Sequence, residues 1–209
     1  PPLREQHHVV EPTRPPDGKL FTVPAFGLRE EREERRRTLA ERTALVAALV
    51  NHDDPAVVWC HLNVESDALV RAIPDAVQVK GSDTLAEKEE RLDAFSRGTI
   101  RVLVTKPTIA GHGLNWQHCA HVVTYASHSF EQFYQSVRRC WRFGQTRPVR
   151  LDIISTTGEV HVRDNLVRKA KAADQMFSRL IEHMNAALRL ERELDHAPVE
   201  VPAWLSLSN

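Results

Sequence analysis

Short apolar runs alternate with amphipathic stretches along most of the chain. Five runs have the length and composition of buried strands, at residues 56–60, 76–79, 100–104, 121–125 and 149–154. Helical spacing of apolar positions fills the intervals, at residues 64–72, 84–97 and 130–142. Strands and helices that alternate at this pace predict βα units in a parallel sheet, and right-handed crossovers would place helices on both of its faces.

Three flanking segments have other patterns. Residues 1–27 hold six of the twelve prolines and are interpreted as a connecting segment with a short strand at residues 8–10. Residues 28–51 predict one long helix whose dense Arg and Glu residues form a solvated face, with contact of the Arg35-Arg36-Arg37 run with nucleic acid as the alternative. Residues 159–194 predict one or two helices that pack back on the domain.

The composition is that of an ordinary globular protein. With 209 residues, 42% of them hydrophobic and 27% charged, the chain can form one large domain or two small ones. This excludes a fibrous chain, a wholly disordered chain and a small disulfide-stapled protein. Lys plus Arg and Asp plus Glu both number 28, so a nucleic-acid site would have to come from local clustering of charge.

Cysteine usage and hydropathy bear on the compartment. The three cysteines, Cys60, Cys119 and Cys140, are scattered, which favours a reducing environment over a disulfide framework. No apolar run approaches the ~18 residues of a membrane span, and the N-terminus has no apolar signal core. We therefore expect a cytoplasmic protein without a membrane segment, and the missing initiator Met is interpreted as the mark of a fragment.

The helix predicted at residues 130–142 carries the clearest candidate chemistry. Gln135, Arg139 and Arg142 have i,i+4 and i,i+3 spacing, so they would share one helix face. Two neighbouring guanidiniums suit a phosphate chain, because each forms bidentate, charge-assisted hydrogen bonds. An arginine at a transferring phosphoryl group also stabilises the charge of the transition state. A surface helix whose arginines pair with acidic neighbours is the alternative explanation.

A second candidate follows the strand predicted at residues 100–104. Gly111 and Gly113 mark a loop beyond that strand, where ligands of open parallel sheets collect. Lys106, Thr108 and the loop amides are suited to holding phosphates. A plain turn is the alternative, because a Gly-x-Gly pair alone is weak evidence for binding.

Together the two segments resemble motifs V and VI of the Snf2-like branch of superfamily 2 helicases. Residues 105–116 are similar to the Gly-rich turn of motif V, which ends in Gly-Leu-Asn. Residues 135–145 resemble motif VI, of form Gln-x-x-x-Arg-x-x-Arg-x-Gly-Gln, and end in Arg-Phe-Gly-Gln where Snf2 proteins typically have Arg-Ile-Gly-Gln. The variants are most similar to bacteriophage and bacterial members.

Further segments extend the resemblance over roughly residues 40–185. Residues 57–62 lie at the place of motif IV, and Lys80-Gly81-Ser82 with the helix that follows is similar to the corresponding part of the same lobe. Three positions depart from the pattern: Arg138 stands where many members have Asp, Trp141 where His is usual, and Ala126 where Asp is frequent. These departures change the local network and leave both motif arginines in place.

The resemblance implies an α/β fold, the second RecA-like lobe, with three layers around a mostly parallel sheet and additional C-terminal helices. Residues 1–27 would be an inter-lobe linker or extension, residues 28–195 the helicase C-terminal lobe and residues 196–209 a tail. The implied activity is ATP-dependent, DNA-stimulated translocation on duplex DNA of low sequence specificity. The ATP site of such enzymes lies between two lobes.

The resemblance also implies roles for individual residues. Arg142 would be the arginine finger, and Arg139 would be a second contact to the γ-phosphate. Gln135 would couple nucleotide to DNA. Two further sets have shared roles: a loop that links ATP and DNA, and a surface near the tracked phosphate backbone. The loop consists of Gly111, Gly113 and Asn115, and the surface of Gly81, Ser82, Lys106 and Thr108.

The elements that bind MgATP are missing from the sequence. A P-loop has the form G-x-x-x-x-G-K-[ST], and the single Gly-Lys pair, Gly18-Lys19, is followed by Leu20. No Asp-Glu-x-His tetrad for Mg²⁺ is found either. ATP and Mg²⁺ are therefore expected to be held mainly by an N-terminal RecA-like lobe of the same polypeptide, and this chain alone is expected to be inactive in ATP hydrolysis.

Other functions fit the residues less well. The histidines and cysteines near residues 112–140 lack a standard zinc spacing, and no G-x-S-x-G nucleophile elbow occurs. A non-catalytic helicase-like module that binds DNA or a protein is the main alternative. The presence of both Arg139 and Arg142 weighs against it, because a degenerate lobe is expected to lose one of them. A motor subunit that works with a nuclease or methylase is a further alternative.

Overall fold

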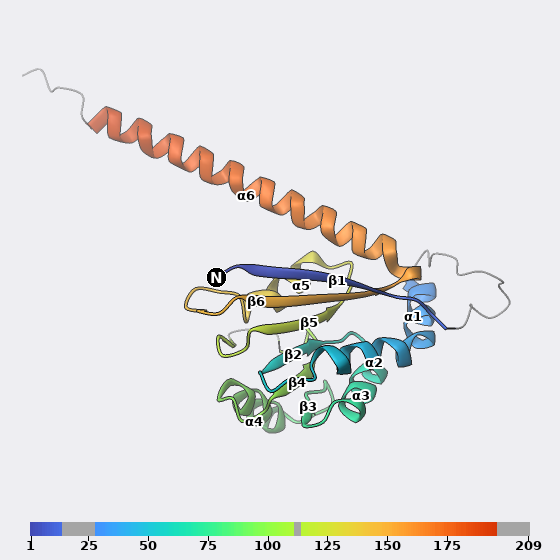
Figure 1. Cartoon of the computed structure of the whole chain (residues 1–209). Helices are drawn as coiled ribbons and strands as arrows, with labels where there is room; N and C mark the ends of the chain where they lie inside the picture. Colours follow the sequence, from blue (N-terminus) through green and yellow to red (C-terminus); the bar gives the residue numbers. More distant parts are fainter. Residues whose placement is uncertain (14–27, 111–113, 196–209) are drawn as a thin grey trace, which may run out of the picture. The chain divides into compact units, whose positions relative to one another are not determined.

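The computed structural model describes residues 1–13, 28–110 and 114–195 (Figure 1). These residues form a six-stranded sheet in the order β1-β6-β5-β2-β4-β3, and every pair of neighbouring strands is parallel. The strands are β1 (Leu3–Val10), β2 (Ala56–Trp59), β3 (Ala76–Gln78), β4 (Val102–Thr105), β5 (His121–Tyr125) and β6 (Val149–Thr156). The prediction of a RecA-like α/β fold with a parallel sheet is confirmed.

Helices connect these strands, as the alternating pattern predicts. They are α1 (Leu28–Arg37), α2 (Leu39–Leu49), α3 (Asn63–Ala72), α4 (Leu85–Ser96), α5 (Phe130–Arg138) and α6 (Val160–Asp195), with a 3-10 turn, η1 (Thr157–Glu159), after β6. Most predicted boundaries lie within two residues of the observed ones. Among the helices, α5 differs most, because it ends four residues earlier than predicted.

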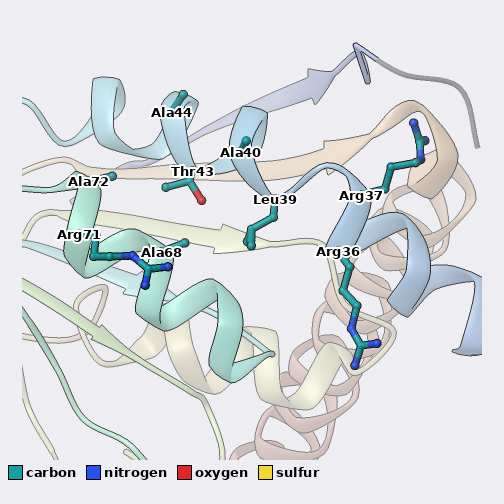
Figure 2. A pocket seen from close by; sticks show the side chains of 9 residues that line it. All are labelled: Arg36, Arg37, Leu39, Ala40, Thr43, Ala44, Ala68, Arg71 and Ala72. Carbon is teal, nitrogen blue, oxygen red and sulfur yellow. The ribbon is translucent and has the colours of Figure 1, made fainter.

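The helices form two layers, one on each face of the sheet. On one face α2 and α3 pack side by side (Figure 2) and bury Val46 and Leu69 against the strands. On the other face α4 and α5 contribute Phe95 and Val137 to a second core cluster. The residues of β2, β4 and β5 are all buried, because helices cover the sheet on both faces. Parallel strands of this kind are mostly apolar in sequence.

The first strand is longer than the sequence predicts. Residues 8–10 were expected to be extended, whereas β1 begins at Leu3 and pairs with β6 over eight positions, from Leu3 opposite Val149 to Val10 opposite Thr156. Leu3–Val10 therefore belong to the sheet and are not a connecting segment. The sequence of β1 is mostly polar and most of its side chains are exposed, so it lacks the apolar pattern that predicts a strand. It is extended because it pairs with β6.

The segment predicted as one long helix forms two. The helices α1 and α2 meet at Thr38, whose Oγ1 donates to the carbonyl oxygen of Glu34 at 2.7 Å. Such a bond competes with the helix ladder and bends the chain. The prediction of a solvated Arg and Glu face holds for one side of α1, where Arg29, Glu33 and Arg36 are exposed. On the other side Glu31 and Glu34 are only 4% and 6% exposed.

The described chain divides into two compact units, residues 1–167 and residues 168–209, and α6 runs from the first into the second. Residues 159–194 were expected to form one or two helices, and the structure has one over most of this segment. In the first unit Val162 and Leu166 of α6 are buried. The predicted tail, residues 196–209, lies outside the described residues. None of the helices in the described parts is both long and apolar enough to cross a membrane.

Candidate nucleotide and nucleic-acid interface

The loops after β2, β3 and β4 lie at one edge of the sheet, because these strands are parallel neighbours. Lys106 directly follows the last residue of β4, and its Nζ donates to Asn63 Oδ1, in the first turn of α3, at 2.6 Å. Thr108 lies two residues further on and is exposed. Asn63 is exposed at the same edge and was not selected from the sequence, where nothing but its place after a strand marks it.

Gly81 and Ser82 follow β3 and are both exposed at this edge. The carbonyl oxygen of Gly81 accepts a hydrogen bond from Lys88 Nζ at 2.8 Å. A Cβ atom added at Gly81 would meet nothing within 4 Å. The four residues predicted to face a phosphate backbone thus follow two adjacent strands, and the surface at Gly81 is open to an approaching ligand.

The loop of the predicted motif V is anchored by Trp116. Its indole Nε1 donates to Ser96 Oγ at 3.0 Å, and its ring stacks on that of Trp59 with centroids 5.8 Å apart. The backbone N–H of Trp116 donates to the carbonyl oxygen of Arg139 at 2.9 Å. Asn115, next to this anchor, is exposed. Gly111 and Gly113 lie outside the described residues.

Gln135, Arg139 and Arg142 do not share a helix face, which corrects the sequence prediction. The helix α5 ends at Arg138, and the N–H groups of Cys140 and Trp141 both donate to the carbonyl oxygen of Val137, so the chain turns there. Gln135 is exposed and donates to Glu131. Arg139 is 7% exposed, with its guanidinium 5.8 Å from the centroid of the Trp116 ring, and burial lowers its pKa.

Arg142 lies on an exposed turn instead of a helix. Within the parts of the chain that the structure describes, its guanidinium has no hydrogen bond or ion pair, so the alternative of pairing with an acidic neighbour has no support here. Phe143, beside it, is 96% exposed. The structure therefore separates the two arginines, one turned inward and one toward solvent.

Two glutamines hold the turn that carries Arg142. Gln117 Nε2 donates to the carbonyl oxygen of Phe143, while the buried Gln145 Nε2 donates to the carbonyl oxygens of Cys119 and Cys140 at 3.1 and 3.2 Å. Gly144 has φ +90°, which an L side chain rarely adopts. Gln117 is a residue that spacing did not reveal, since its role comes from a contact across 26 residues of sequence.

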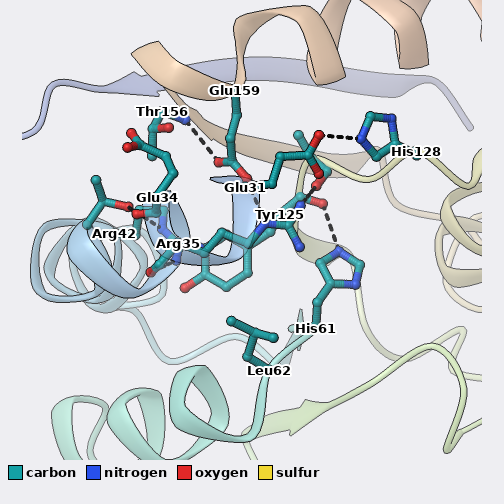
Figure 3. Close-up of polar contacts among 12 residues, drawn as sticks. Glu31, Glu34, Arg35, Arg42, His61, Leu62, Tyr125, His128, Thr156 and Glu159 are labelled. Atoms are coloured by element: carbon teal, nitrogen blue, oxygen red, sulfur yellow. Dashed lines mark hydrogen bonds and ion pairs between the residues drawn. The ribbon is translucent and has the colours of Figure 1, made fainter. Parts of the chain in front are cut away.

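A buried polar network lies at the ends of β5 and β6 (Figure 3). Arg35 donates to Glu159 Oε1 at 2.6 Å and to the carbonyl oxygen of Ala126 at 2.8 Å, which fastens α1 to the sheet. Glu31 accepts from His128 Nε2 at 2.7 Å. These distant partners explain why part of the charged surface of α1 is buried.

The centre of this network is an ion pair between Arg42 and Glu65, whose side chains are 0% exposed. Arg42 Nη1 lies 2.8 Å from Glu65 Oε1, and its guanidinium lies 4.5 Å from the Tyr125 ring centroid. Burial alone would raise the pKa of Glu65, but the charge of Arg42 and the N–H groups of His61 and Leu62 lower it below its ordinary value. The pair joins α2 to α3 and to the end of β5.

Several of the histidines and cysteines of the zinc alternative, His121 and Cys119 among them, have other partners. His121 Nε2 lies 2.7 Å from Asp152 Oδ2, and its Nδ1 lies 2.7 Å from His52 Nε2. Cys119 is buried and its thiol donates to carbonyl oxygens. Over residues 1–13, 28–110 and 114–195, no three His, Cys, Asp or Glu side chains are grouped so that they could hold a metal ion.

Comparison with known protein families identifies a domain in the chain. The family model of the helicase conserved C-terminal domain matches residues 40–144, about half of the chain, and this range includes every predicted site residue. No significant match was found among curated proteins.

Several solved structures share the fold, at identities that carry no conclusion beyond it. The C-terminal part of the Fun30 ATPase domain has a TM-score of 0.51 and 17% identity, and covers 61% of this chain and 44% of that one. A variant of the S. cerevisiae Dbp5 C-terminal domain, bound to Gle1 and IP6, has a TM-score of 0.53, 13% identity and coverages of 64% and 80%.

The E. coli DEAD-box protein SrmB, bound to the regulator of ribonuclease activity A, has a TM-score of 0.52, 17% identity and coverages of 63% and 79%. The aligned part of the chain thus spans less than half of the Fun30 structure and most of the two others. With a matching family model and the fold of superfamily 2 C-terminal lobes, the chain belongs to the family of helicase conserved C-terminal domains.

Proposed function

We propose that the chain is the second motor lobe of an ATP-dependent, DNA-stimulated helicase or translocase of the Snf2-like branch. It would supply the arginine finger, Arg142, and part of the surface that tracks DNA. Membership of the helicase C-terminal family and the Arg142-Phe143-Gly144-Gln145 run support this proposal. Catalysis would require an N-terminal RecA-like lobe of the same polypeptide.

The observation that carries the proposal is the environment of Arg142. Its guanidinium is exposed and without a hydrogen-bond or ion-pair partner among the described residues, on a turn held by Gln117 and Gln145. Pre-organised positive charge of this kind stabilises a transferring phosphoryl group when a second lobe brings that group within reach. Arg139, which packs against Trp116, would act beside it as a second γ-phosphate contact.

The chain has a residue suited to the phosphates of ATP but lacks the motif that holds Mg²⁺. The guanidinium of Arg142 is suited to the terminal phosphate of ATP. The sequence has no Asp-Glu-x-His tetrad, so Mg²⁺ would be held mainly by the partner lobe. When bound, the ion would neutralise phosphate charge, while this chain would contribute charge and orientation from Arg142.

The nucleic-acid surface is assigned to the edge formed by the loops after β3 and β4. Gly81, Ser82, Lys106 and Thr108 would face the phosphate backbone of duplex DNA, so binding would show little sequence preference. Gly111, Gly113 and Asn115, with Gln135, would link this surface to the nucleotide. The bond from Trp116 to the carbonyl oxygen of Arg139 supports such a link, because it joins the two motifs directly.

A non-catalytic module is the second candidate. The C-terminal domain of Dbp5 and the protein SrmB are both bound to protein partners in their structures, which shows that lobes of this fold can serve as docking surfaces. In that case the exposed Arg142 would have no part in hydrolysis.

The decisive experiment measures ATP hydrolysis by this chain alone and by the chain joined to the segment encoded directly upstream. Each form is assayed without nucleic acid, with duplex DNA and with duplex RNA of the same sequence. No turnover by the chain alone and DNA-stimulated turnover by the joined form is the expected result. Absence of turnover in every arm would favour the binding module, and stimulation by RNA alone would reject the assignment to DNA.

A further inference from the structure

An open groove lies between α2 and α3, on the side of these helices that faces away from the sheet (Figure 2). Its volume is about 500 Å³. It is lined by Arg36, Arg37, Leu39, Ala40, Thr43, Ala44, Ala68, Arg71 and Ala72. None of these residues belongs to the nucleotide or nucleic-acid surface proposed above, so the groove has no assigned role.

The charge of the groove has one sign. Its lining has three arginines and no acidic residue. Arg37 is paired with Glu34, but Arg36 and Arg71 are exposed and make no hydrogen bond or close ion pair within the described parts of the chain. Arg71 also interacts electrostatically with Asp67, one turn away on α3, which does not line the groove. Two exposed guanidiniums beside one groove favour a ligand that carries carboxylates or phosphates.

The groove also contains an unsatisfied buried hydroxyl. Thr43 is 6% exposed, and its Oγ1 is buried without a hydrogen-bond partner in the structure. In Figure 2 this side chain points into the space between α2 and α3, close to Leu39. A buried hydroxyl without a partner is costly, and a ligand with a carbonyl or carboxylate oxygen at this place would satisfy it.

The floor is formed by small residues at helical spacing. Ala40 and Ala44 lie one turn apart on α2, and Ala68 and Ala72 lie one turn apart on α3. Short side chains let a main chain approach closely and offer it apolar contact. A polyphosphate would use the arginines but gain nothing from this floor, whereas a peptide with acidic and small apolar residues would use both.

We propose that the groove between α2 and α3 binds an acidic peptide segment of a protein partner. Its carboxylates would pair with Arg36 and Arg71, its small side chains would lie on the alanines, and one of its oxygens would accept from Thr43 Oγ1. The proposal is independent of ATP hydrolysis and of the nucleic-acid surface.

The test uses the full chain and a fluorescein-labelled peptide of alternating Glu and Ala, with fluorescence anisotropy at low salt. A Lys-Ala peptide of equal length is the control for charge, and tripolyphosphate and duplex DNA are competitors that represent the other anions. We expect the Glu-Ala peptide alone to bind, at micromolar to submillimolar Kd, as is common for short and transient contacts.

Three variants localise the binding. The double substitution Arg36→Glu with Arg71→Glu should weaken binding at least about tenfold, because two attractive contacts become repulsive. The matched control, Arg32→Glu with Arg97→Glu, changes the net charge equally at exposed positions outside the groove and should have a small effect. Ala44→Trp, at an exposed position, should block the groove by filling it.

Thr43→Val separates ligand binding from a structural role. Valine keeps the shape and removes the unpartnered hydroxyl, so the melting temperature should stay the same or rise while peptide binding weakens about three- to tenfold. The proposal is overturned if the Glu-Ala peptide does not bind at millimolar concentration or if tripolyphosphate or DNA displaces it through the same arginines. It is equally overturned if the control pair of substitutions weakens binding as much as the groove pair.

Discussion

Arg139 and Arg142 lie three residues apart in the sequence and in opposite environments in the structure. Their residue types and spacing identified both as candidates for phosphate chemistry. The helical spacing rule failed for them, because α5 ends at Arg138 and the next residues form turns held by contacts from distant segments. The candidate residues were thus predictable from the sequence, but the directions of their side chains were not.

Arg142→Ala tests the proposed chemistry in the form of the enzyme that contains both lobes. Because the exposed guanidinium would act on the transferring phosphoryl group, ATP turnover should fall on the order of 10³-fold or more. DNA binding should stay close to normal. Steady-state hydrolysis and an equilibrium DNA-binding assay measure the two effects.

The matched control for this variant is Arg138→Ala, an exposed arginine four residues away that lies over the Trp141 ring. It should leave turnover within a few-fold of the unmodified enzyme. Near-normal hydrolysis by the Arg142 variant would remove this residue from the chemistry.

Lys106→Ala tests the nucleic-acid surface. Loss of one phosphate contact should weaken DNA binding and reduce the slope of log K against log salt by about 1. Arg97→Ala removes a positive charge from the far end of α4 and should leave the slope unchanged. DNA titrations over a range of salt concentrations distinguish the two results, and an unchanged slope for Lys106→Ala would exclude this residue from the DNA path.

At the scale of elements, apolar runs predicted the central strands well, and charge patterns predicted only one side of α1. The bounds of β5 were predicted without error because a buried parallel strand is mostly apolar, although β5 also buries His121 and Thr124. The charges of α1 have the same spacing as those of a solvated helix. Arg35 and Glu31 contact Glu159 and His128, which lie far from them in the sequence, so no local rule identifies this side of α1 as buried.

The ion pair that joins α2 to α3 should dominate the stability of this layer. Arg42→Leu leaves Glu65 buried and unpaired, which should lower the free energy of unfolding by about 3–5 kcal/mol. Adding Glu65→Leu should restore part of the loss, although the N–H groups of His61 and Leu62 then lose their acceptor. Urea unfolding of the two variants measures this, and equal stability of both would contradict a role for the isolated charge.

The turn after α5 depends on the conformation of Gly144. An alanine there would have to adopt a positive φ, and its Cβ would displace the amide of Gln117, so Gly144→Ala should lower the free energy of unfolding by about 1–2 kcal/mol. Gly81→Ala is the matched control, since its added Cβ meets nothing within 4 Å. Thermal unfolding would contradict the interpretation if the two substitutions had equal effects.

At the scale of the whole molecule, the alternating pattern predicted the class of fold but not the order of its strands. The parallel sheet follows from the spacing of strands and helices. The pairing of β1 with β6, and of β5 with β2, depends on contacts between segments that are far apart in the sequence. The pattern of residues within each strand therefore does not predict which strand will be its neighbour.

The stability of the molecule should depend on pH through His61. Burial, and next the charge of Arg35, lower the pKa of His61 to about 4 from an ordinary value of 6.5. Between these values the unfolded chain binds a proton that the folded protein excludes, so the free energy of unfolding falls as the pH drops from about 6.5 to about 4. The lowered pKa of Glu65 adds a further loss at lower pH, as that carboxylate becomes protonated.

Urea midpoints measured across this range should decrease toward acid. His61→Asn should flatten the dependence, because asparagine does not titrate. The same slope in both proteins would assign the pH dependence to other histidines whose pKa burial lowers, such as the half-buried His52.

The pairing of β1 with β6 has a consequence for synthesis of the protein. Leu3 emerges from the ribosome ~145 residues before its partner Val149, which corresponds to roughly 7–30 s of translation at common rates. During that interval β6 has not been synthesised, so β1 has no strand to pair with. Because a long loop must close before the two strands meet, β1 should join the sheet late and slowly. The Arg, Glu, Gln and His side chains of β1 keep the unpaired strand hydrated. The strand should therefore have little tendency to aggregate or to bind chaperones that recognise apolar segments.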